Sequence, residues 1–170
     1  EGDESGTTRA ETARQTGYAA SMALLDEGKY EDGYALLRTL GDYNGATAYV
    51  PQHEMQRADA YLAAGEYDEA LALYEHIEEM ASAGTNAEYT HEIKQTAQDR
   101  TSETWYRMGE MLFAQAKNEE DYFDVMFVFM NAGSYTPEGG IPADKRYVSL
   151  WYEKGEALLA QETPDYDGAK

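Results

Sequence analysis

Histidine side chains are the first residues in this chain to consider for chemistry, because they bind metals and transfer protons near neutral pH. The three histidines are His53, His76 and His91. None stands in a His-Glu-x-x-His arrangement, the helical spacing that binds catalytic zinc. We therefore expect each histidine to lie at the surface or to cap a helix.

Acidic clusters are the second candidates. Glu119-Glu120-Asp121 is expected to be a solvated turn, because a catalytic carboxylate pair needs burial to separate its two pKa values. Asp165-x-Asp167-Gly168 has the beginning of a calcium loop but lacks the loop's other ligands, so the opening of another helical unit explains it better. Gly-rich phosphate loops and nucleophile elbows are also missing. The sequence thus predicts no enzyme, no cofactor and no metal site.

Tyrosine is the one unusual enrichment, with 15 residues in the chain. We expect most of these side chains to pack between helices with the hydroxyl reaching solvent. The alternative is a platform of exposed tyrosines that binds a carbohydrate or a peptide.

The balance of charge limits the partners. The chain has 170 residues, with 33 acidic and 13 basic side chains and a formal net charge of -20. Such a chain repels nucleic acid and anionic membrane surfaces. A cationic protein, peptide or polyamine is the partner we expect, and a surface that is acidic only for solubility is the alternative.

Cysteine and membrane signals are absent from the sequence. Without cysteine the chain forms no disulfide and no thiolate metal site. No apolar run approaches the roughly 20 residues that span a bilayer, so we expect no direct membrane insertion. The chain begins at Glu1 rather than Met, which a signal peptide or membrane anchor upstream would explain. We therefore expect an extracytoplasmic or cell-surface location, with a cytoplasmic one as the alternative.

Apolar residues recur at helical spacing between glycine stops, which predicts an all-α chain of about seven helices. The expected helices cover residues 17–27, 30–40, 50–64, 68–83, 87–116, a segment that opens at Asp121, and 142–161. Thr85 or Asn86 is expected to cap the fifth helix. Residues 1–8 are expected to be disordered, and residues 9–170 to form one domain of four units, 10–41, 46–84, 87–133 and 142–170.

Two internal repeats connect these units. Residues 28–40 match residues 65–77 at an offset of 37, so that Gly28 corresponds to Gly65. Residues 105–112 match residues 151–158 at an offset of 46, so that Trp105 corresponds to Trp151. Gly109 lies inside a predicted helix, where glycine costs about 1 kcal/mol relative to alanine. We therefore expect another helix to approach closely at Gly109.

These motifs resemble the tetratricopeptide repeats, helical hairpins of about 34 residues that stack into a solenoid. The first-helix pattern is matched by Trp105, Met108, Gly109 and Leu112. The turn and second helix are matched by Gly65, Tyr67, Ala70, Tyr74 and Ile77, and Thr136-Pro137 matches the proline that ends a unit. The resemblance covers about residues 17–169 and is of the divergent bacterial type. It implies stacked antiparallel hairpins wound into a right-handed α-α superhelix.

The resemblance also implies a binding face, because the first helices of such units line the concave side. The residues placed there are Tyr18, Met22, Met55, Asp59, Leu62, Tyr106, Glu110, Phe113, Tyr152, Glu156 and Leu159. Asp59, Glu110 and Glu156 would form an acidic line over an apolar and aromatic floor. Such a groove suits an extended segment that carries Lys or Arg together with apolar side chains. The alternative is that these residues pack against the next helix or face water.

The function we expect is therefore a protein–protein interaction scaffold without catalysis, whose concave face binds a basic and apolar peptide segment. The alternative is a small-ligand or glycan-binding module of an exported bacterial surface or uptake protein. Salt dependence separates the two, because capture of a basic segment weakens with salt and stacking of a sugar on tyrosine does not.

Overall fold

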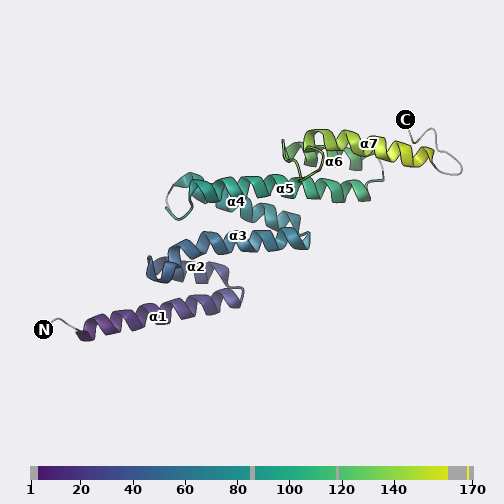
Figure 1. Cartoon of the computed structure of the whole chain (residues 1–170). Helices are drawn as coiled ribbons and strands as arrows, with labels where there is room; N and C mark the ends of the chain where they lie inside the picture. The colour runs from purple at the N-terminus through teal and green to yellow at the C-terminus, as the bar shows by residue number, and fades with distance from the viewer. Residues whose placement is uncertain (1–3, 85–86, 118, 161–167, 169–170) are drawn as a thin grey trace.

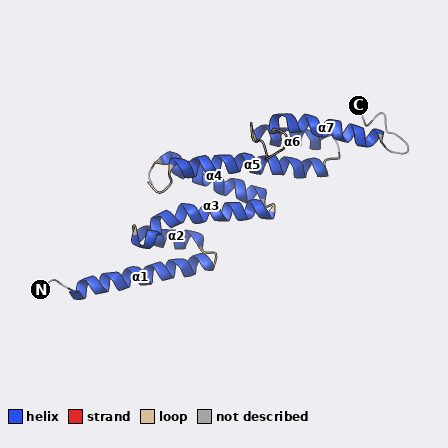
Figure 2. Ribbon diagram, viewed as in Figure 1, coloured by secondary structure: helices blue, strands red, loops and turns tan. Residues whose placement is uncertain are grey.

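The computed structural model describes residues 4–84, 87–117, 119–160 and 168, and all of the regular structure in them is helical (Figure 2). The elements are α1 (Glu4–Asp26), α2 (Tyr30–Thr39), the 3-10 turn η1 (Tyr43–Gly45), α3 (Ala46–Ala64), α4 (Tyr67–Ala83), α5 (His91–Gln115), α6 (Glu119–Asn131) and α7 (Ala143–Leu159).

The helices form an open stack in chain order. Helices α1 and α2, α3 and α4, and α5 and α6 are hairpins, and each helix packs mainly against its neighbours in the chain (Figure 1). Helix α7 adds to α6 at one end of the stack, and α1 lies at the other end. The prediction of an all-α stack of antiparallel hairpins is confirmed.

The buried side chains divide into three clusters. The first joins α1, α2 and the start of α3 through Leu25, Tyr34, Leu37, Ala46 and Val50. The second joins α3, α4 and α5 through Ala58, Leu62, Ala70, Tyr74, Ile77, Tyr89 and Ala97. The third joins α5, α6 and α7 through Tyr106, Val125, Phe129, Ala132, Ala143 and Leu150. Each hairpin therefore buries its apolar side against the next, as in a repeat protein.

The turns between paired helices follow the repeat of 37 residues. Gly28 and Gly65 have φ angles of 77° and 78°, a left-handed conformation that glycine adopts without steric cost. Gly33 and Ala70 then occupy equivalent buried positions in α2 and α4. A Cβ atom on Gly33 would stand 2.6 Å from Cδ2 of Leu25, so these small residues allow the paired helices to approach.

Helix α5 is long enough to serve two hairpins. Its first half contributes Ala97 to the second cluster, and its second half contributes Tyr106 to the third. The last two helices are therefore displaced along α5, which gives the staircase outline of the stack (Figure 1). The long connection 132–142 lies between the two repeated segments and contributes to the larger step of 46 residues.

The first helix begins earlier than predicted. Helix α1 starts at Glu4, so that residues 4–8 are helical although the whole segment 1–8 was expected to be disordered. Most side chains between residues 7 and 16 are exposed. The helix there lacks an apolar stripe, and for this reason the sequence pattern did not reveal it.

The third helix also begins earlier, at Ala46 rather than near residue 50. Asn44 and Gly45 have φ angles of 49° and 71°, and this tight entry lets the helix start at once. Pro51 consequently lies in the second turn of α3 rather than the first. It is buried there, and it lacks the amide that would bond to the carbonyl of Thr47.

The fifth and sixth helices have different first turns from those predicted. Helix α5 begins at His91, and Thr90 caps it by accepting a hydrogen bond from the Ile93 amide at 3.3 Å. The expected caps, Thr85 and Asn86, lie outside the described residues. The acidic run 119–121 is the first turn of α6 rather than a turn between helices. Carboxylates are favourable at that end of a helix because they complement its dipole.

The last helix runs from Ala143 to Leu159, with Pro142 as its N-cap. It therefore ends slightly before residue 161. The motif Asp165–Ala169, interpreted as the opening of another helix, lies outside the described residues apart from Gly168. None of the helices among the described residues combines the length and the apolar character needed to cross a membrane.

Candidate functional site: the groove between α3 and α5

The predicted residues at the beginning of the chain serve packing. Tyr18 and Met22 on α1 are half-buried and pack against the first cluster. The ring of Tyr18 meets that of Tyr43 edge to face, with 6.3 Å between centroids. Leu62 is buried in the second cluster.

Asp59 is held by two neighbours. Its carboxylate accepts a hydrogen bond from the Tyr74 hydroxyl at 2.7 Å and pairs with Nε of Arg100 at 3.2 Å. Burial, and then the hydrogen bond to Asp59, raises the pKa of the Tyr74 hydroxyl. Arg100 also bonds Glu103, which pairs in turn with Arg107. The carboxylate of Asp59 thus belongs to a network of ion pairs.

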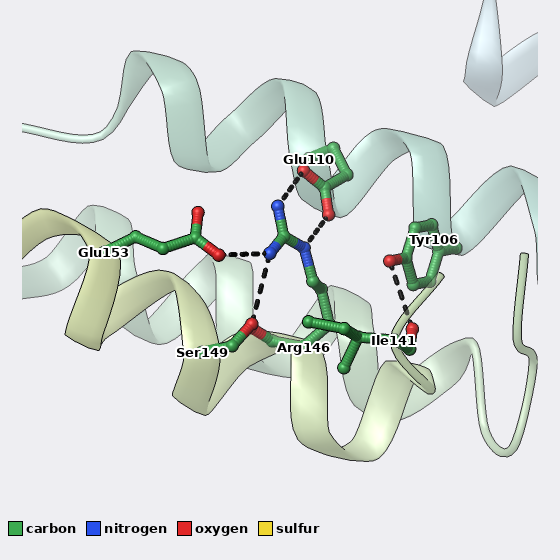
Figure 3. Close-up of polar contacts among 6 residues, drawn as sticks. All are labelled: Tyr106, Glu110, Ile141, Arg146, Ser149 and Glu153. Atoms are coloured by element: carbon green, nitrogen blue, oxygen red, sulfur yellow. Dashed lines mark hydrogen bonds and ion pairs between the residues drawn. The ribbon is translucent and has the colours of Figure 1, made fainter. Parts of the chain in front are cut away.

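Glu110 is likewise paired with an arginine (Figure 3). Arg146 of α7 reaches across to α5, and its Nε and Nη2 bond the two carboxylate oxygens of Glu110 at 2.5 and 3.1 Å. Nη1 of Arg146 bonds Glu153 and Ser149. The hydrogen bonds to Glu110 raise the pKa of the Arg146 guanidinium further. This fork joins α7 to α5.

The remaining predicted residues divide between core and surface. Tyr106 is buried, and its hydroxyl donates to the carbonyl of Ile141 at 3.2 Å (Figure 3). Phe113 packs against the third cluster, and its ring centroid lies 5.7 Å from that of Tyr122. Tyr152 and Glu156 are exposed on α7, beside the exposed Leu159. Two members of the predicted acidic line, Asp59 and Glu110, are therefore paired with arginines, and the third, Glu156, is exposed.

A groove of about 590 Å³ lies between α3 and the beginning of α5. Its lining residues are Ala48, Pro51, Gln52, Met55, Gln56, Glu88, Thr90, Glu92, Ile93 and Thr96. Met55 is the one predicted site residue among them. Met55 and Ile93 are its half-buried apolar side chains, and its carboxylates are those of Glu88 and Glu92. Two helices thus supply an apolar floor, and the beginning of α5 supplies the acidic side.

One buried hydrogen bond supports the turn beside this groove. The hydroxyl of Tyr89 donates to the carboxylate of Glu54 at 2.6 Å, and both side chains are buried. Burial, and then this bond, raises the pKa of the Tyr89 hydroxyl. Glu88 next to it accepts a hydrogen bond from the Thr47 hydroxyl at 3.2 Å. The turn before α5 is thereby held against α3, with Glu88 and Thr90 beside the groove.

Sequence reasoning missed most of this groove, because it exists only where α3 and α5 meet. The spacing of Ala48, Gln52 and Met55 could have indicated one face of a helix. The acidic side at Glu88 and Glu92 could not be paired with that face, because its position depends on how the turn 87–90 folds back on α3.

His53 differs from the expectation for it. It is half-buried, its Nδ1 lies 2.9 Å from the Tyr34 hydroxyl, and its ring stacks on that of Tyr49 at 5.3 Å. Burial, and then the charge of Arg57, lowers the pKa of His53. The Arg57 guanidinium lies 3.4 Å from the centroid of the Tyr30 ring. This cation–π contact holds the arginine among the aromatic rings between α2 and α3. His76 and His91 are exposed.

Comparison with protein-family models, with curated proteins and with solved structures finds no match for this chain. The internal repeats and the geometry of the stack are therefore the basis of the functional argument.

Proposed function

We propose that this chain is a protein-interaction scaffold of the tetratricopeptide-like type, and that the groove between α3 and α5 holds an extended partner segment. The observation that carries the proposal is the composition of the groove, in which Met55 and Ile93 lie beside the carboxylates of Glu88 and Glu92. A segment with alternating apolar and basic side chains would bury the former and pair the latter.

The charge of the whole chain supports the same class of partner. A net charge of -20 attracts cationic segments from a distance and speeds their encounter. Arg100 is paired with Asp59 and Glu103, and Arg146 is paired with Glu110. The positive charge of these arginines is balanced by the carboxylates beside them, so the electrostatic potential around the molecule stays negative.

The glycan-binding alternative has less support. A stacking platform needs several exposed aromatic rings, and Tyr152 is the single tyrosine that is exposed among the described residues. Several tyrosine hydroxyls bond inside the protein, as Tyr74 and Tyr89 do. The stack uses its tyrosines chiefly as packing residues.

A pair of synthetic peptides tests the proposal. One is a fluorescein-labelled unstructured peptide of repeated Lys-Leu-Ser-Gly units, and the other has glutamate in place of each lysine. We expect the lysine peptide to bind in fluorescence anisotropy. Its affinity should fall steeply between low salt and about 0.3 M salt, because the Debye length shortens. The glutamate peptide should not bind.

Two variants locate the binding. Glu92→Gln removes a carboxylate from the groove, and Glu79→Gln removes one from the exposed side of α4. We expect the first to weaken lysine-peptide binding severalfold more than the second. Equal effects would place the interaction outside the groove, and equal binding of the two peptides would overturn the proposal.

A further inference from the structure

His53 lies at the joint between the first hairpin and the rest of the stack. Helix α1 packs mainly on α2, so α2 is the helix that attaches the first hairpin to α3. The His53 ring, half-buried on α3, stacks on that of Tyr49 and lies 6.1 Å from the ring of Tyr30 on α2. The stack on Tyr49 accepts the ring in either protonation state. A side chain that titrates near neutral pH therefore stands where two hairpins meet.

The hydrogen bonds at this joint require a neutral imidazole. Tyr34 of α2 is 1% exposed, and its hydroxyl accepts a hydrogen bond from Nη1 of Arg57 at 3.4 Å. The same hydroxyl lies 2.9 Å from Nδ1 of His53, which is its acceptor among the described residues. We therefore assign the proton of the neutral ring to Nε2, which leaves Nδ1 free to accept. In this state the buried hydroxyl both accepts and donates.

A proton on His53 breaks this arrangement. Both nitrogens of an imidazolium are donors, so Nδ1 can no longer accept the hydroxyl proton of Tyr34. Leaving a buried donor without its acceptor is unfavourable. The buried carboxylate of Glu54 is already engaged, because it accepts the Tyr89 hydroxyl at 2.6 Å and lies 3.8 Å from Nε2 of His76. The joint thus has no ready acceptor for the Tyr34 proton.

The charges around His53 oppose protonation as well. Arg57 lies one turn further along α3, and its buried Nε has no hydrogen-bond partner among the described residues. Arg38 of α2 is a second cation, 6.0 Å from the centroid of the Tyr34 ring. Asp26, exposed at the end of α1, is the carboxylate that favours the proton. Burial, and then Arg57, outweighs Asp26 and lowers the pKa of His53.

We propose that the joint between α2 and α3 is an acid-sensitive hinge, in which protonation of His53 releases the first hairpin from the rest of the stack. At neutral pH the ring is uncharged and the joint is closed. A detached hairpin leaves His53 in water, where its pKa returns to about 6.5. The closed state therefore loses stability as the pH falls from about 6.5 through the lowered pKa of the closed joint. The hinge does not depend on the groove between α3 and α5.

Hydrogen exchange of the full chain tests the hinge. Exchange is measured by mass spectrometry at pH 7.5 and pH 5.5, and each rate is divided by the intrinsic rate at that pH. We expect the protection of residues 17–39 to fall at least about fivefold at pH 5.5, because a buried donor loses its acceptor. The protection of residues 67–115 should not fall. Constant protection of residues 17–39, or an equal fall in both segments, would overturn the proposal.

Two histidine variants form a matched pair. His53→Phe keeps a ring beside Tyr49 but cannot take up a proton, whereas His91→Phe removes an exposed histidine from α5. The first leaves the Tyr34 hydroxyl without its acceptor at every pH. We therefore expect its protection in residues 17–39 to be low at pH 7.5 and unchanged at pH 5.5. His91→Phe should behave like the parent. A fall in His53→Phe equal to that of the parent would overturn the hinge.

The unaltered chain gives a test that does not depend on how the variants fold. Nuclear magnetic resonance follows the ring signals of the three histidines from pH 8 to pH 5, while amide exchange follows α2 over the same range. We expect the loss of protection in α2 to share its midpoint with the titration of His53. A midpoint that follows His76 or His91 instead would overturn the proposal.

Discussion

Gly109 lies directly beneath the ring of Phe129, and a Cβ atom on this glycine would stand 2.8 Å from two of the ring carbons. The contact joins α5 to α6 within the third cluster, in which Phe129 is almost completely buried. A glycine inside a helix is unfavourable by itself, so the close approach of the two helices accounts for it.

Enlarging this glycine should therefore weaken the fold. We expect Gly109→Leu to lower the free energy of unfolding by about 1–3 kcal/mol, because the Phe129 ring must move from a packed site. Urea denaturation followed by circular dichroism measures it. Ala114→Leu, at an exposed position of the same helix, should change stability by less than about 0.5 kcal/mol. A Gly109→Leu protein as stable as the parent would contradict the close packing.

The buried bond between Tyr89 and Glu54 makes a second prediction. Tyr89→Phe removes the hydroxyl that donates to a buried carboxylate. We expect a loss of about 1–3 kcal/mol, the usual cost of leaving such a group without its partner. Tyr152→Phe, on an exposed ring, is the control. If the two variants unfold at the same urea concentration, the hydroxyl of Tyr89 does not support the turn before α5.

Alkaline pH should destabilise the folded chain. Burial raises the pKa of Tyr74 and Tyr89 above the ordinary value of about 10, so these hydroxyls stay protonated in the fold where they ionise in the unfolded chain. Their contribution to stability is complete below pH 10 and is lost as the pH rises through the raised values. Urea midpoints measured from pH 8 to 11 should fall, and the fall should be smaller in Tyr74→Phe. An identical pH profile for that variant would show that Tyr74 does not contribute.

The fork between Arg146 and Glu110 should hold α7 in place. Arg146→Met removes both of its hydrogen bonds to Glu110 while keeping an apolar stem. We expect a loss of about 1–2 kcal/mol, because the ion pair is bidentate and half-buried. Lys145→Met changes the same charge at an exposed neighbour and should have little effect. Hydrogen exchange should show the loss mainly in α7. Uniform exchange across the chain would contradict a local role.

Much of the fold could be predicted from local signals. Gly28 and Gly65 ended helices because a left-handed residue stops a helix wherever it occurs. Ala70 indicated a close contact between paired helices, because the sequence around it repeats the sequence around Gly33. These signals act within one or two turns of chain. The start of α1 carried no such signal, since its exposed residues show no apolar period.

The candidate site could be predicted far less well. Asp59 and Glu110 were placed on a binding face, but their partners Arg100 and Arg146 are 41 and 36 residues away in the sequence. A pairing at that distance depends on how hairpins are displaced along α5. The groove at Met55 depends on how the turn 87–90 folds back on α3, and only the assembled stack reveals it.

Helix α5 is shared between two clusters of buried residues, and this has a mechanical consequence. Tension applied between α1 and α7 would load the first and third clusters from outside, because these two helices belong to different clusters and α5 lies between them in the stack. The terminal hairpins can peel away while α5 stays seated on one neighbour. The array should therefore lengthen in successive steps when it is stretched, with one group of helices unfolding at each step.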